Sequence, residues 1–450
     1  MSHTSTTADR ASSTPTALRA APATAESGFV PHRPGLVQVP GDAAELRARI
    51  KVLLPEIAAG ASHRERNRQL PYAWIRTLAE AGLFSLRIPR QHGGPGGTVR
   101  DLFELLLDIA AADSNIAQAL RPGFGFVESL LAAGDAAQLQ HWLPHLLDGE
   151  IFGNAGWERG GPNGQITARI TQDPHTGQRH ITGTKFYSTG ALYADWVSSF
   201  ALDDSGQETG FVVPRARPGL DLVDDFDAIG QHLTASGTTV FTQVEVQPQE
   251  IRPTMSRDRR SPLPPYYQLV LAAVEAGIAR NALNDAIAFT REHARPIKHS
   301  TATRSVDDPY VQETVGQIAA QAYAAEGAVL RAALAIDAAW QAGLTQEALT
   351  TASIEVAQAQ HFAVQAALKA AELVFDVAGA TATLRTHNLD RHWRNARTVA
   401  NHNPMSHSPT IRQRKPIVLN AFNMNCVGHI NRSEERHVGK ECRSRWSPYH

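Results

Sequence analysis

The turn after a basic helical segment near the C-terminal end holds the residues of this sequence best suited to proton transfer. The basic segment runs from Asp390 to Arg397, and Asn401-His402-Asn403-Pro404 follows almost at once. An imidazole accepts and returns a proton near neutral pH, whereas the amide of Asn403 cannot take up a proton at any useful pH. The turn therefore offers a proton relay, His402, and no carboxylate base.

Three kinds of sequence pattern predict the elements that must position this turn. Apolar residues recur at helical spacing over residues 41–149, short alternating runs fill residues 150–255, and long helical stripes return over residues 256–420. We expect an N-terminal helical domain, a small central antiparallel β-barrel or sandwich, and a C-terminal four-helix bundle. The fold class is thus α+β, mainly α. Residues 1–40 and 421–450 are expected to be tails, the second partly a non-native read-through.

Two details of the C-terminal third extend that expectation. Asp307-Asp308-Pro309 has the acidic cap and the first-turn proline of a helix start. Further on, His361 falls on an apolar stripe rich in alanine, where a hydrogen-bonded core histidine is the expected interpretation. Alanine-lined helices of this length leave faces that a lone bundle does not cover, so we expect the chain to form an oligomer.

The composition excludes several classes of partner. Of 450 residues, 43 are Lys or Arg and 44 are Asp or Glu, so no net field attracts nucleic acid or an anionic membrane. No apolar run is long enough to span a bilayer, and the N-terminus lacks a secretory signal. We expect a cytoplasmic protein with a small-molecule substrate. The cysteines, Cys426 and Cys442, have no metal-ligand spacing, and no metal site is predicted.

Four groups of short motifs follow one another along the chain. They are Leu78-Ala79-Glu80-Ala81-Gly82-Leu83 with Ile88-Pro89 and Gly93-Gly94, Gly183-Thr184-Lys185-Phe186-Tyr187-Ser188-Thr189-Gly190, Ile229-Gly230-Gln231 with Thr234-Ala235-Ser236-Gly237, and Arg394-Asn395-Ala396-Arg397. In this order they resemble the acyl-CoA dehydrogenase superfamily, over roughly residues 44–413. Each motif alone is weak, but their common order is specific. The resemblance implies an acyl-CoA dehydrogenase-like fold, in agreement with the expected order of domains.

The turn at His402 decides which branch of that superfamily the chain resembles. Acyl-CoA dehydrogenases abstract a proton with a carboxylate, which in one large branch is the Glu of a Tyr-Glu-Gly turn. The same place here is taken by His402-Asn403-Pro404, although other branches carry the base on a different helix. The sequence is similar instead to the flavin-dependent monooxygenase branch, which includes dibenzothiophene and sulfone monooxygenases. Those enzymes react reduced FMN with O2 to a C4a-hydroperoxide, which transfers one oxygen to the substrate.

The resemblance implies roles for particular residues. The candidate catalytic residues are His402, as a proton relay, and the hydroxyls of Ser188 and Thr189, as donors to the flavin N5 or the peroxide. The candidates for cofactor binding are Asn154, Trp157, Ser188, Thr189, Arg394 and, for the FMN phosphate, Arg295. The candidates for lining the substrate pocket are Phe124, Phe226 and Asn403.

Several of these residues also have plain structural interpretations. The two hydroxyl residues suit an ordinary turn, His402 suits a helix cap, and Trp157 suits the core of the β domain. The arginines of the C-terminal segment recur every three residues, which is typical of a solvated stripe, and this interpretation is the stronger one for Arg391. Asp390 and Arg394 have the spacing of a helical ion pair.

The resemblance is incomplete at two positions. Family members often carry histidine where this chain has Gly123, and tryptophan where it has Phe226. We therefore expect that a second catalytic histidine is missing and that the substrate pocket is reshaped.

No dinucleotide fingerprint follows a strand anywhere in the sequence, so reduced flavin would have to come from a separate NAD(P)H:flavin reductase. The resemblance implies FMN rather than FAD, a homotetramer, and a small apolar substrate, with organosulfur compounds as a candidate class. Two alternatives stay open. One is an FAD-dependent acyl-CoA dehydrogenase with a displaced base, and the other is a catalytically silent flavin-binding scaffold.

Overall fold

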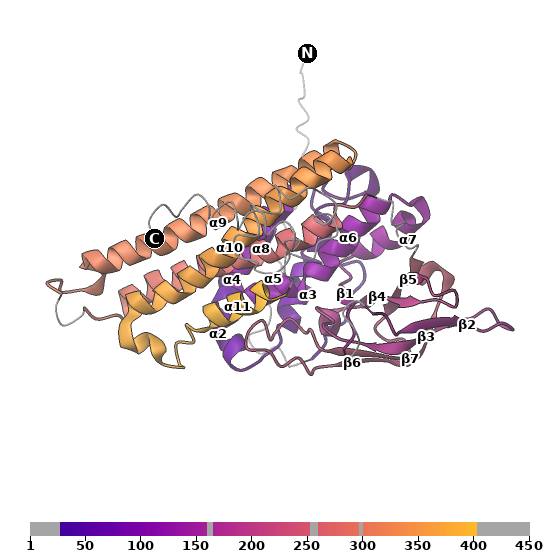
Figure 1. Ribbon diagram of the computed structural model, residues 1–450, viewed down its shortest axis with the longest axis horizontal. Coiled ribbons are helices and arrows are strands. Elements are labelled where there is room, and N and C mark those ends of the chain that lie inside the picture. Colours follow the sequence, from indigo (N-terminus) through magenta and orange to yellow (C-terminus); the bar gives the residue numbers. More distant parts are fainter. Residues whose placement is uncertain (1–27, 160–164, 253–259, 297–299, 403–450) are drawn as a thin grey trace, which may run out of the picture.

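The computed structural model of the chain describes residues 28–159, 165–252, 260–296 and 300–402. A group of shorter helices occupies the N-terminal part, the sheet lies to one side of it, and three long helices run across the molecule (Figure 1). Asn403, both cysteines and the predicted C-terminal tail lie outside the described residues.

The N-terminal helices begin and end where local chemistry favours it. Thr98 and Asp101 form a capping box at the start of α4. Pro122 stands in the first turn of α6, and Gly134 ends that helix at φ +61°. The helices are α1 (Ala43–Lys51), α2 (Leu54–Arg66), α3 (Tyr72–Glu80), α4 (Val99–Ala112), α5 (Ser114–Ala119), α6 (Arg121–Ala133) and α7 (Ala136–Leu147).

The central region is one mixed sheet rather than the antiparallel barrel or sandwich that the sequence predicts. Its strand order is β6-β7-β3-β2-β4-β5-β8, and β1 pairs with β4. The β1–β4 and β2–β4 pairs are parallel, because β4 follows a crossover through the 3-10 turn η3 instead of a tight hairpin. The strands are β1 (Phe152–Ala155), β2 (Arg169–Gln172), β3 (Arg179–Lys185), β4 (Trp196–Leu202), β5 (Glu208–Pro214), β6 (Leu220–Val223), β7 (Thr238–Val246) and β8 (Ile251–Arg252).

Long C-terminal helices are confirmed. Helices α8 (Leu263–Glu292), α9 (Pro309–Gln341) and α10 (Gln346–Ala378) pack together, and α11 (Arg391–Ala400) lies against α8 and α10. Helix α4 of the N-terminal region also packs against α8 and α9, so the packed group draws one member from outside the C-terminal third. The predicted start of α9 is confirmed as well, because Asp308 caps it by accepting from Tyr310 N over 2.9 Å.

The predicted place of His361 in the core is wrong. The side chain is exposed on α10, and its ring lies 3.1 Å from Gln365 Nε2. The buried stripe passes instead through Ala359, Ala363 and Ala367. Larger apolar residues of the predicted stripe, such as Ile354, Val364 and Leu368, are only partly buried, whereas most alanines of α10 are buried, so a stripe drawn through the larger residues misplaces the buried face.

The predicted N-terminal tail is too long. Residues 28–40 lie against the body of the protein: Arg76 Nε donates to Val30 O over 3.1 Å, and Arg33 pairs with Glu80. The prediction is therefore wrong for these residues. Within the described part of the chain, no helix is both long and apolar enough to cross a membrane. The 3-10 turns are η1 (Leu83–Ser85), η2 (Arg90–His92), η3 (Ala191–Tyr193), η4 (Pro248–Glu250), η5 (Ser305–Asp307) and η6 (Gly379–Thr383).

Candidate active site

The turn after β3 carries Ser188 and Thr189, and both side chains are buried. Thr239 donates to Ser188 Oγ over 2.8 Å, and the hydroxyl oxygens of Thr189 and Ser236 lie 2.9 Å apart. The backbone N–H of Ser188 donates to Gly237 O over 3.1 Å. The two residues are thus turn residues, and their hydroxyls also belong to a buried polar cluster between β3 and β7.

Strand β1 brings Asn154 next to this turn. Asn154 N donates to Thr189 O over 3.2 Å. The preceding residue has to be glycine, because a Cβ at Gly153 would lie 2.7 Å from Ala191 Cα. The Oδ1 atom of Asn154 is buried and has no hydrogen-bond partner among the described residues. An orphaned amide oxygen beside two hydroxyl groups fits a ligand with N–H donors, such as a flavin ring.

The start of α6 lies against the same turn. A Cβ at Gly190 would lie 2.5 Å from Ala119 O and 3.6 Å from Pro122 Cγ, so the turn and the helix start are in close contact. Arg121 is the first residue of α6, and its guanidinium carbon lies 4.8 Å from the ring centroid of Tyr267 on α8. Segments far apart in the sequence therefore meet here: β1, the β3 turn, α6 and α8.

His402 joins this cluster from the C-terminal end of α11. Its Nε2 lies 3.4 Å from Arg121 Nη1, while its backbone N–H donates to Val399 O over 3.0 Å. The residue itself is exposed, yet surrounding protein desolvates the imidazole, and this effect together with repulsion from Arg121 lowers the pKa of His402. A neutral ring that accepts from the guanidinium carries its proton on Nδ1. The backbone N–H caps the helix, and with a pKa of about 3 the ring stays neutral near pH 7, with one proton on Nδ1.

Gly123, where the family often has histidine, faces the ring of Phe84. A Cβ at this position would lie 2.3 Å from Phe84 Cε1, so any side chain here requires the ring to move. Phe84 is buried, and its ring centroid lies 5.5 Å from that of Phe124. The space of the missing histidine is thus filled by an aromatic core. Phe124 belongs to that core, and its role in a substrate pocket stays a prediction.

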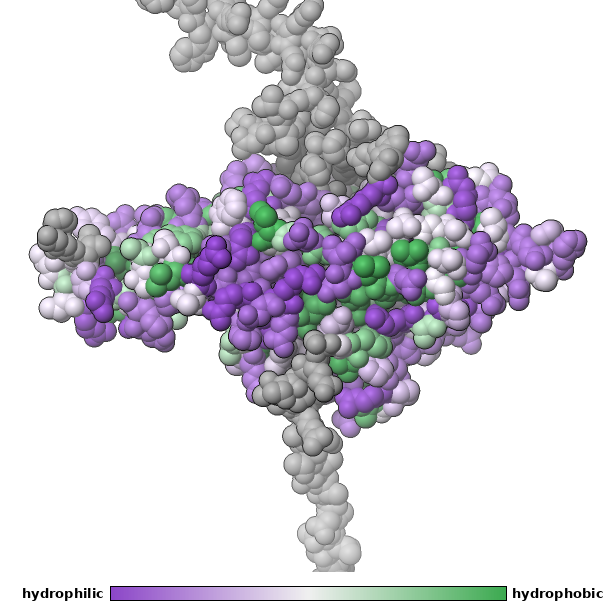
Figure 2. Space-filling view, turned by 90° about the horizontal axis from the view of Figure 1, so that it is seen from below, coloured by the Kyte–Doolittle hydropathy of each residue, from purple (hydrophilic) through white to green (hydrophobic). Residues whose placement is uncertain are grey.

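Aromatic side chains form a rim beside the turn. Trp157 and Tyr187 are each 53% exposed, so the interpretation of Trp157 as β-domain core is wrong. Phe226 is almost fully buried, and its ring centroid lies 6.3 Å from that of Tyr187. In the view from below, apolar side chains gather in the middle of the molecule between polar margins (Figure 2). The ligand-binding roles of Trp157 and Phe226 stay predictions.

Arg394 is bound to other protein groups. Its guanidinium pairs with Glu65 on α2 and with Asp390, the latter over 2.7 Å, and it also donates to Ile229 O and Asn388 Oδ1. The predicted ion pair with Asp390 is confirmed. Burial alone would raise the pKa of Glu65, but hydrogen bonds from His232, Arg394 and Asn388 lower it to about 2. These contacts use the donors of Arg394, whose role in cofactor binding stays a prediction.

Arg391 is not part of a solvated stripe, and that expectation is wrong. The residue is buried, and it donates to Asp285 Oδ2 on α8 over 2.6 Å. His392 lies 2.9 Å from the same oxygen. The spacing of three predicts that the arginines share one exposed helix face. Arg391 is buried instead because it pairs with Asp285, which lies 106 residues away in sequence. Arg391 and Arg394 thus fix α11 to α8 and α2.

Arg295 lies far from the other candidates within one chain. It is exposed, shortly after the end of α8. Tyr267, which contacts Arg121, stands near the start of that helix, roughly 40 Å away at 1.5 Å per residue. The structure therefore does not bring Arg295 together with Ser188 and His402 of the same chain, and its role at the FMN phosphate stays a prediction.

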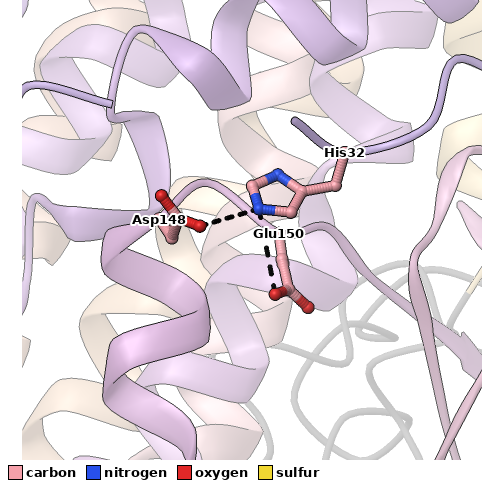
Figure 3. A group of neighbouring side chains, drawn as sticks. All are labelled: His32, Asp148 and Glu150. Carbon is pink, nitrogen blue, oxygen red and sulfur yellow. Dashed lines mark hydrogen bonds and ion pairs between the residues drawn. The ribbon is translucent and has the colours of Figure 1, made fainter. Parts of the chain in front are cut away.

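A second cluster of polar side chains lies at the N-terminal segment. His32 Nε2 is 2.8 Å from Asp148 Oδ2 and 3.9 Å from Glu150 Oε1 (Figure 3). Glu150 also lies 3.0 Å from His145 Nδ1, and Asp148 accepts from Gly35 N over 2.8 Å. Three ligand-type groups within 4.8 Å suit a cation, but each already has protein partners. The contacts account for the attachment of residues 28–40.

Arg121 and Tyr267 were missed from sequence. The sequence did hold a signal for Arg121, because this cation is the first residue of a helix whose first turn contains no acidic residue to pair with it. Its contact with His402 spans 281 residues, and Tyr267 reads as one more aromatic residue in a buried helix. Only the folded chain shows that these side chains face each other.

Comparison with known proteins assigns the chain to a family. Residues 44–150 match the model of the acyl-CoA dehydrogenase N-terminal domain, and residues 269–407 match that of the C-terminal domain. Dibenzothiophene monooxygenase from Mycolicibacterium goodii is 32% identical over 368 residues, covering 76% of this chain and 87% of the relative. The chain belongs to the acyl-CoA dehydrogenase superfamily, among its flavin-dependent monooxygenases.

Two further relatives support this assignment. A probable FMNH2-dependent monooxygenase, SfnC from Pseudomonas putida, is 29% identical, covering 79% of this chain and 90% of the relative. The FMN-bound crystal structure of TdsC from Paenibacillus sp. A11-2 superposes with a TM-score of 0.72 at 27% identity, covering 82% of this chain and 98% of TdsC. The acyl-CoA dehydrogenase-like fold and the flavin-dependent oxidoreductase class expected from sequence are thereby confirmed.

Proposed function

We propose that this protein is a two-component monooxygenase. It would take reduced FMN from a separate NAD(P)H:flavin reductase and use O2 to oxygenate a small substrate with an apolar body, with organosulfur compounds as a candidate class. Bound reduced FMN would supply the electrons that activate O2 for this transfer. Two relatives support this choice of cofactor, because TdsC binds FMN in its crystal structure and SfnC is described as FMNH2-dependent.

The observation that carries the proposal is the environment of His402. Its ring contacts Arg121, and among the described residues no carboxylate hydrogen-bonds to it. A dehydrogenase needs a carboxylate there or on another helix, whereas oxygen transfer needs a group that donates and recovers a proton. A neutral imidazole at the edge of the cluster suits proton exchange during oxygen transfer, and it suits the abstraction of a proton from carbon poorly.

One carboxyl group nearby has to be compared with His402, because a displaced base would favour the acyl-CoA dehydrogenase alternative. Glu275 lies on α8, about 12 Å along the helix from Tyr267. The side chain is fully buried, neither oxygen has a hydrogen-bond partner among the described residues, and burial raises its pKa well above the ordinary value. No hydrogen bond joins Glu275 to Ser188, Thr189 or His402 among the described residues, so nothing places it at the candidate site in support of the dehydrogenase.

The proposal assigns a task to each group around the turn. Ser188, Thr189 and Asn154 would hydrogen-bond the flavin ring, and His402 would hold the proton needed at the reacting oxygen. The aromatic rim would exclude water from the site. Arg295 can serve this cluster only from a neighbouring chain, because it is roughly 40 Å away within its own. That arrangement is compatible with the homotetramer that the family resemblance implies.

Reductase dependence and acyl-CoA reactivity test the proposal. We expect the purified protein to consume chemically reduced FMN in air but to oxidise no NADH until a flavin reductase is added. Acyl-CoA thioesters should not bleach the oxidised flavin of the reconstituted protein. NADH turnover by the protein alone, or bleaching by an acyl-CoA, would contradict the proposal.

A further inference from the structure

Three buried hydroxyl groups form a hydrogen-bonded row from the turn after β3 into the loop that precedes β7. The hydroxyl oxygens of Thr189 and Ser236 lie 2.9 Å apart, and those of Ser236 and Thr234 lie 2.8 Å apart. Thr234 Oγ1 in turn lies 2.8 Å from the carbonyl oxygen of Gln231. All three residues of this hydroxyl row are at most 5% exposed. Each hydroxyl therefore finds its partners within the protein or on a bound ligand.

The carbonyl group at the end of the hydroxyl row fixes the direction of every hydrogen bond in it. A hydroxyl group has one hydrogen to donate, and a carbonyl oxygen only accepts. Thr234 therefore donates to Gln231 O, because any other direction would leave two acceptor oxygens 2.8 Å apart with no hydrogen between them. Ser236 then has to donate to Thr234, and Thr189 has to donate to Ser236. The hydroxyl of Thr189 has thus used its hydrogen, and only its lone pairs are left for a ligand.

The neighbouring hydroxyl group has the opposite polarity. Ser188 Oγ accepts from Thr239 over 2.8 Å, so the hydrogen of Ser188 is left to donate. Asn154 adds a second acceptor, because its buried Oδ1 has no partner among the described residues. Its backbone N–H donates to Thr189 O over 3.2 Å, which holds strand β1 beside the turn. The turn and the strand together offer two acceptors, on Thr189 and Asn154, and one donor, on Ser188.

This set of polar groups matches reduced flavin in kind and number. The oxidised isoalloxazine ring has a single N–H group, at N3, and its N5 is an acceptor without hydrogen. Reduction adds a hydrogen at N5, so that an N–H group stands on each side of the C4 carbonyl. The reduced ring can therefore pair with two acceptors and one donor, whereas the oxidised ring leaves one acceptor of the protein unpaired. A polar group left unpaired in a desolvated site weakens binding.

We propose that Thr189 accepts a hydrogen bond from reduced FMN, and that the hydroxyl row through Ser236 and Thr234 makes the site selective for the reduced cofactor. Ser236 and Thr234 are positioning residues, since they act on the ligand only through Thr189. This inference rests on the proposed function and deepens it. It explains how the protein distinguishes the reduced FMN that it consumes from the oxidised FMN that remains after turnover.

Titration of the full-length protein with oxidised FMN, and under anaerobic conditions with reduced FMN, tests the selectivity. We expect the wild type to bind reduced FMN at least about tenfold more tightly, which places the two-electron potential of bound FMN about 30 mV above that of free FMN. Thr189→Val keeps the shape of the side chain and removes its oxygen. It should raise the Kd of reduced FMN about tenfold and change the Kd of oxidised FMN less than about twofold.

A matched control and a modified cofactor isolate the hydrogen bond. Thr290→Val removes another buried hydroxyl group, which donates to Ala286 O over 2.7 Å near the end of α8, and it should change neither Kd. Reduced 5-deaza-FMN has carbon in place of N5. We expect it to bind the wild type about tenfold more weakly than reduced FMN does, and to bind Thr189→Val as tightly as reduced FMN does.

Variants that retain Thr189 separate the direction of the hydrogen bond from a loss of packing. Thr234→Val removes the acceptor of Ser236, so Ser236 is free to donate to Thr189 and the Thr189 hydrogen turns toward the ligand. A donor there suits N5 of oxidised FMN. We expect the Kd of oxidised FMN to fall and that of reduced FMN to rise, each by about threefold, which a structural defect alone does not produce. Ser236→Ala should act in the same way, because it removes the acceptor of Thr189 itself.

Thr189→Ser retains the hydroxyl group and should keep the selectivity of the wild type, so the test holds even if Thr189→Val does not fold. Equal Kd values for the two redox states in the wild type would overturn the inference. So would an unchanged ratio of the two Kd values in Thr234→Val and Ser236→Ala. An equal loss of affinity for both redox states in Thr189→Val would assign Thr189 a structural role only and overturn it as well.

Failure of this inference is distinguishable from failure of the proposed function. The Kd values are measured without turnover, reduced FMN being kept free of oxygen. A protein that selects reduced FMN through Thr189 but never oxygenates any substrate would contradict the proposed function and leave the selectivity standing. A protein that forms oxygenated product but binds the two redox states of FMN equally would do the reverse.

Discussion

The arginines of α11 and those around Tyr267 illustrate two uses of one side chain. Arg391 and Arg394 are each paired with an acid from another helix, and these pairs position α11. Arg121 and Arg252 are only partly buried, and no acid among the described residues pairs with either. A charge paired with a buried acid contributes to the architecture, whereas a partly exposed charge without an acid partner keeps part of its hydration and contributes little.

Removal of a paired arginine should have the largest effect on stability. Arg394→Gln leaves the buried Glu65 carboxylate without its main counter-ion. We expect the free energy of unfolding to fall by about 4 kcal/mol, the usual cost of breaking a buried ion pair. Urea denaturation followed by circular dichroism measures this value. A loss below about 1 kcal/mol would mean that the pair behaves like an exposed one.

The pH dependence of stability tests the contribution of the same ion pair through the Glu65 carboxylate. The pKa of Glu65 is about 2 in the folded chain, below its ordinary value, so its contribution is complete above about pH 4.5 and is lost as pH falls toward 2. Over this range we expect a loss of about 3 kcal/mol from this group. Unfolding curves at several acidic pH values should show it. Glu65→Gln should flatten that part of the profile, and a parallel profile would contradict the assignment.

Overpacking at Gly123 should have the next largest effect on stability. Gly123→Ala places a methyl group against the Phe84 ring, and we expect a loss of about 2 kcal/mol from overpacking. Gly327→Ala on α9 is the matched control, because nothing lies within 4 Å of that Cβ position. It should stabilise the protein by about 0.5–1 kcal/mol through helix propensity. Equal effects of the two substitutions on thermal unfolding would rule out the close contact.

Removal of an unpaired arginine should have the smallest effect on the free energy of unfolding, and its sign should be opposite to that of Arg394→Gln. Arg121→Gln removes a partly buried cation that has no acidic partner among the described residues, so stability should stay the same or rise by up to about 1 kcal/mol. The measurement is the same urea titration as for Arg394→Gln. If Arg121→Gln destabilises the protein as strongly as Arg394→Gln does, the contrast between the two regions is wrong.

Sequence reasoning succeeded where the relevant information was local. The cap at Asp308, the ion pair of Asp390 with Arg394 and the order of helical and β regions depend on residues close together in the chain. It failed where the partner was distant. Arg391 needed Asp285, and the contact of Arg121 with His402 crosses most of the chain. The buried face of α10 was also misplaced, since larger apolar side chains such as Ile354 and Leu368 lie outside the buried face.

The central claim is that His402 serves oxygen transfer rather than proton abstraction from carbon. Stopped-flow mixing of the protein and reduced FMN with oxygenated buffer tests it most directly, with His402→Gln and the exposed His361→Gln for comparison. We predict that the wild type and His361→Gln show a transient flavin absorbance distinct from both the reduced and oxidised forms, and that oxygenated product per reduced FMN falls about 100-fold in His402→Gln. Direct reoxidation in the wild type at the rate of free FMN, or undiminished product in His402→Gln, would contradict the claim.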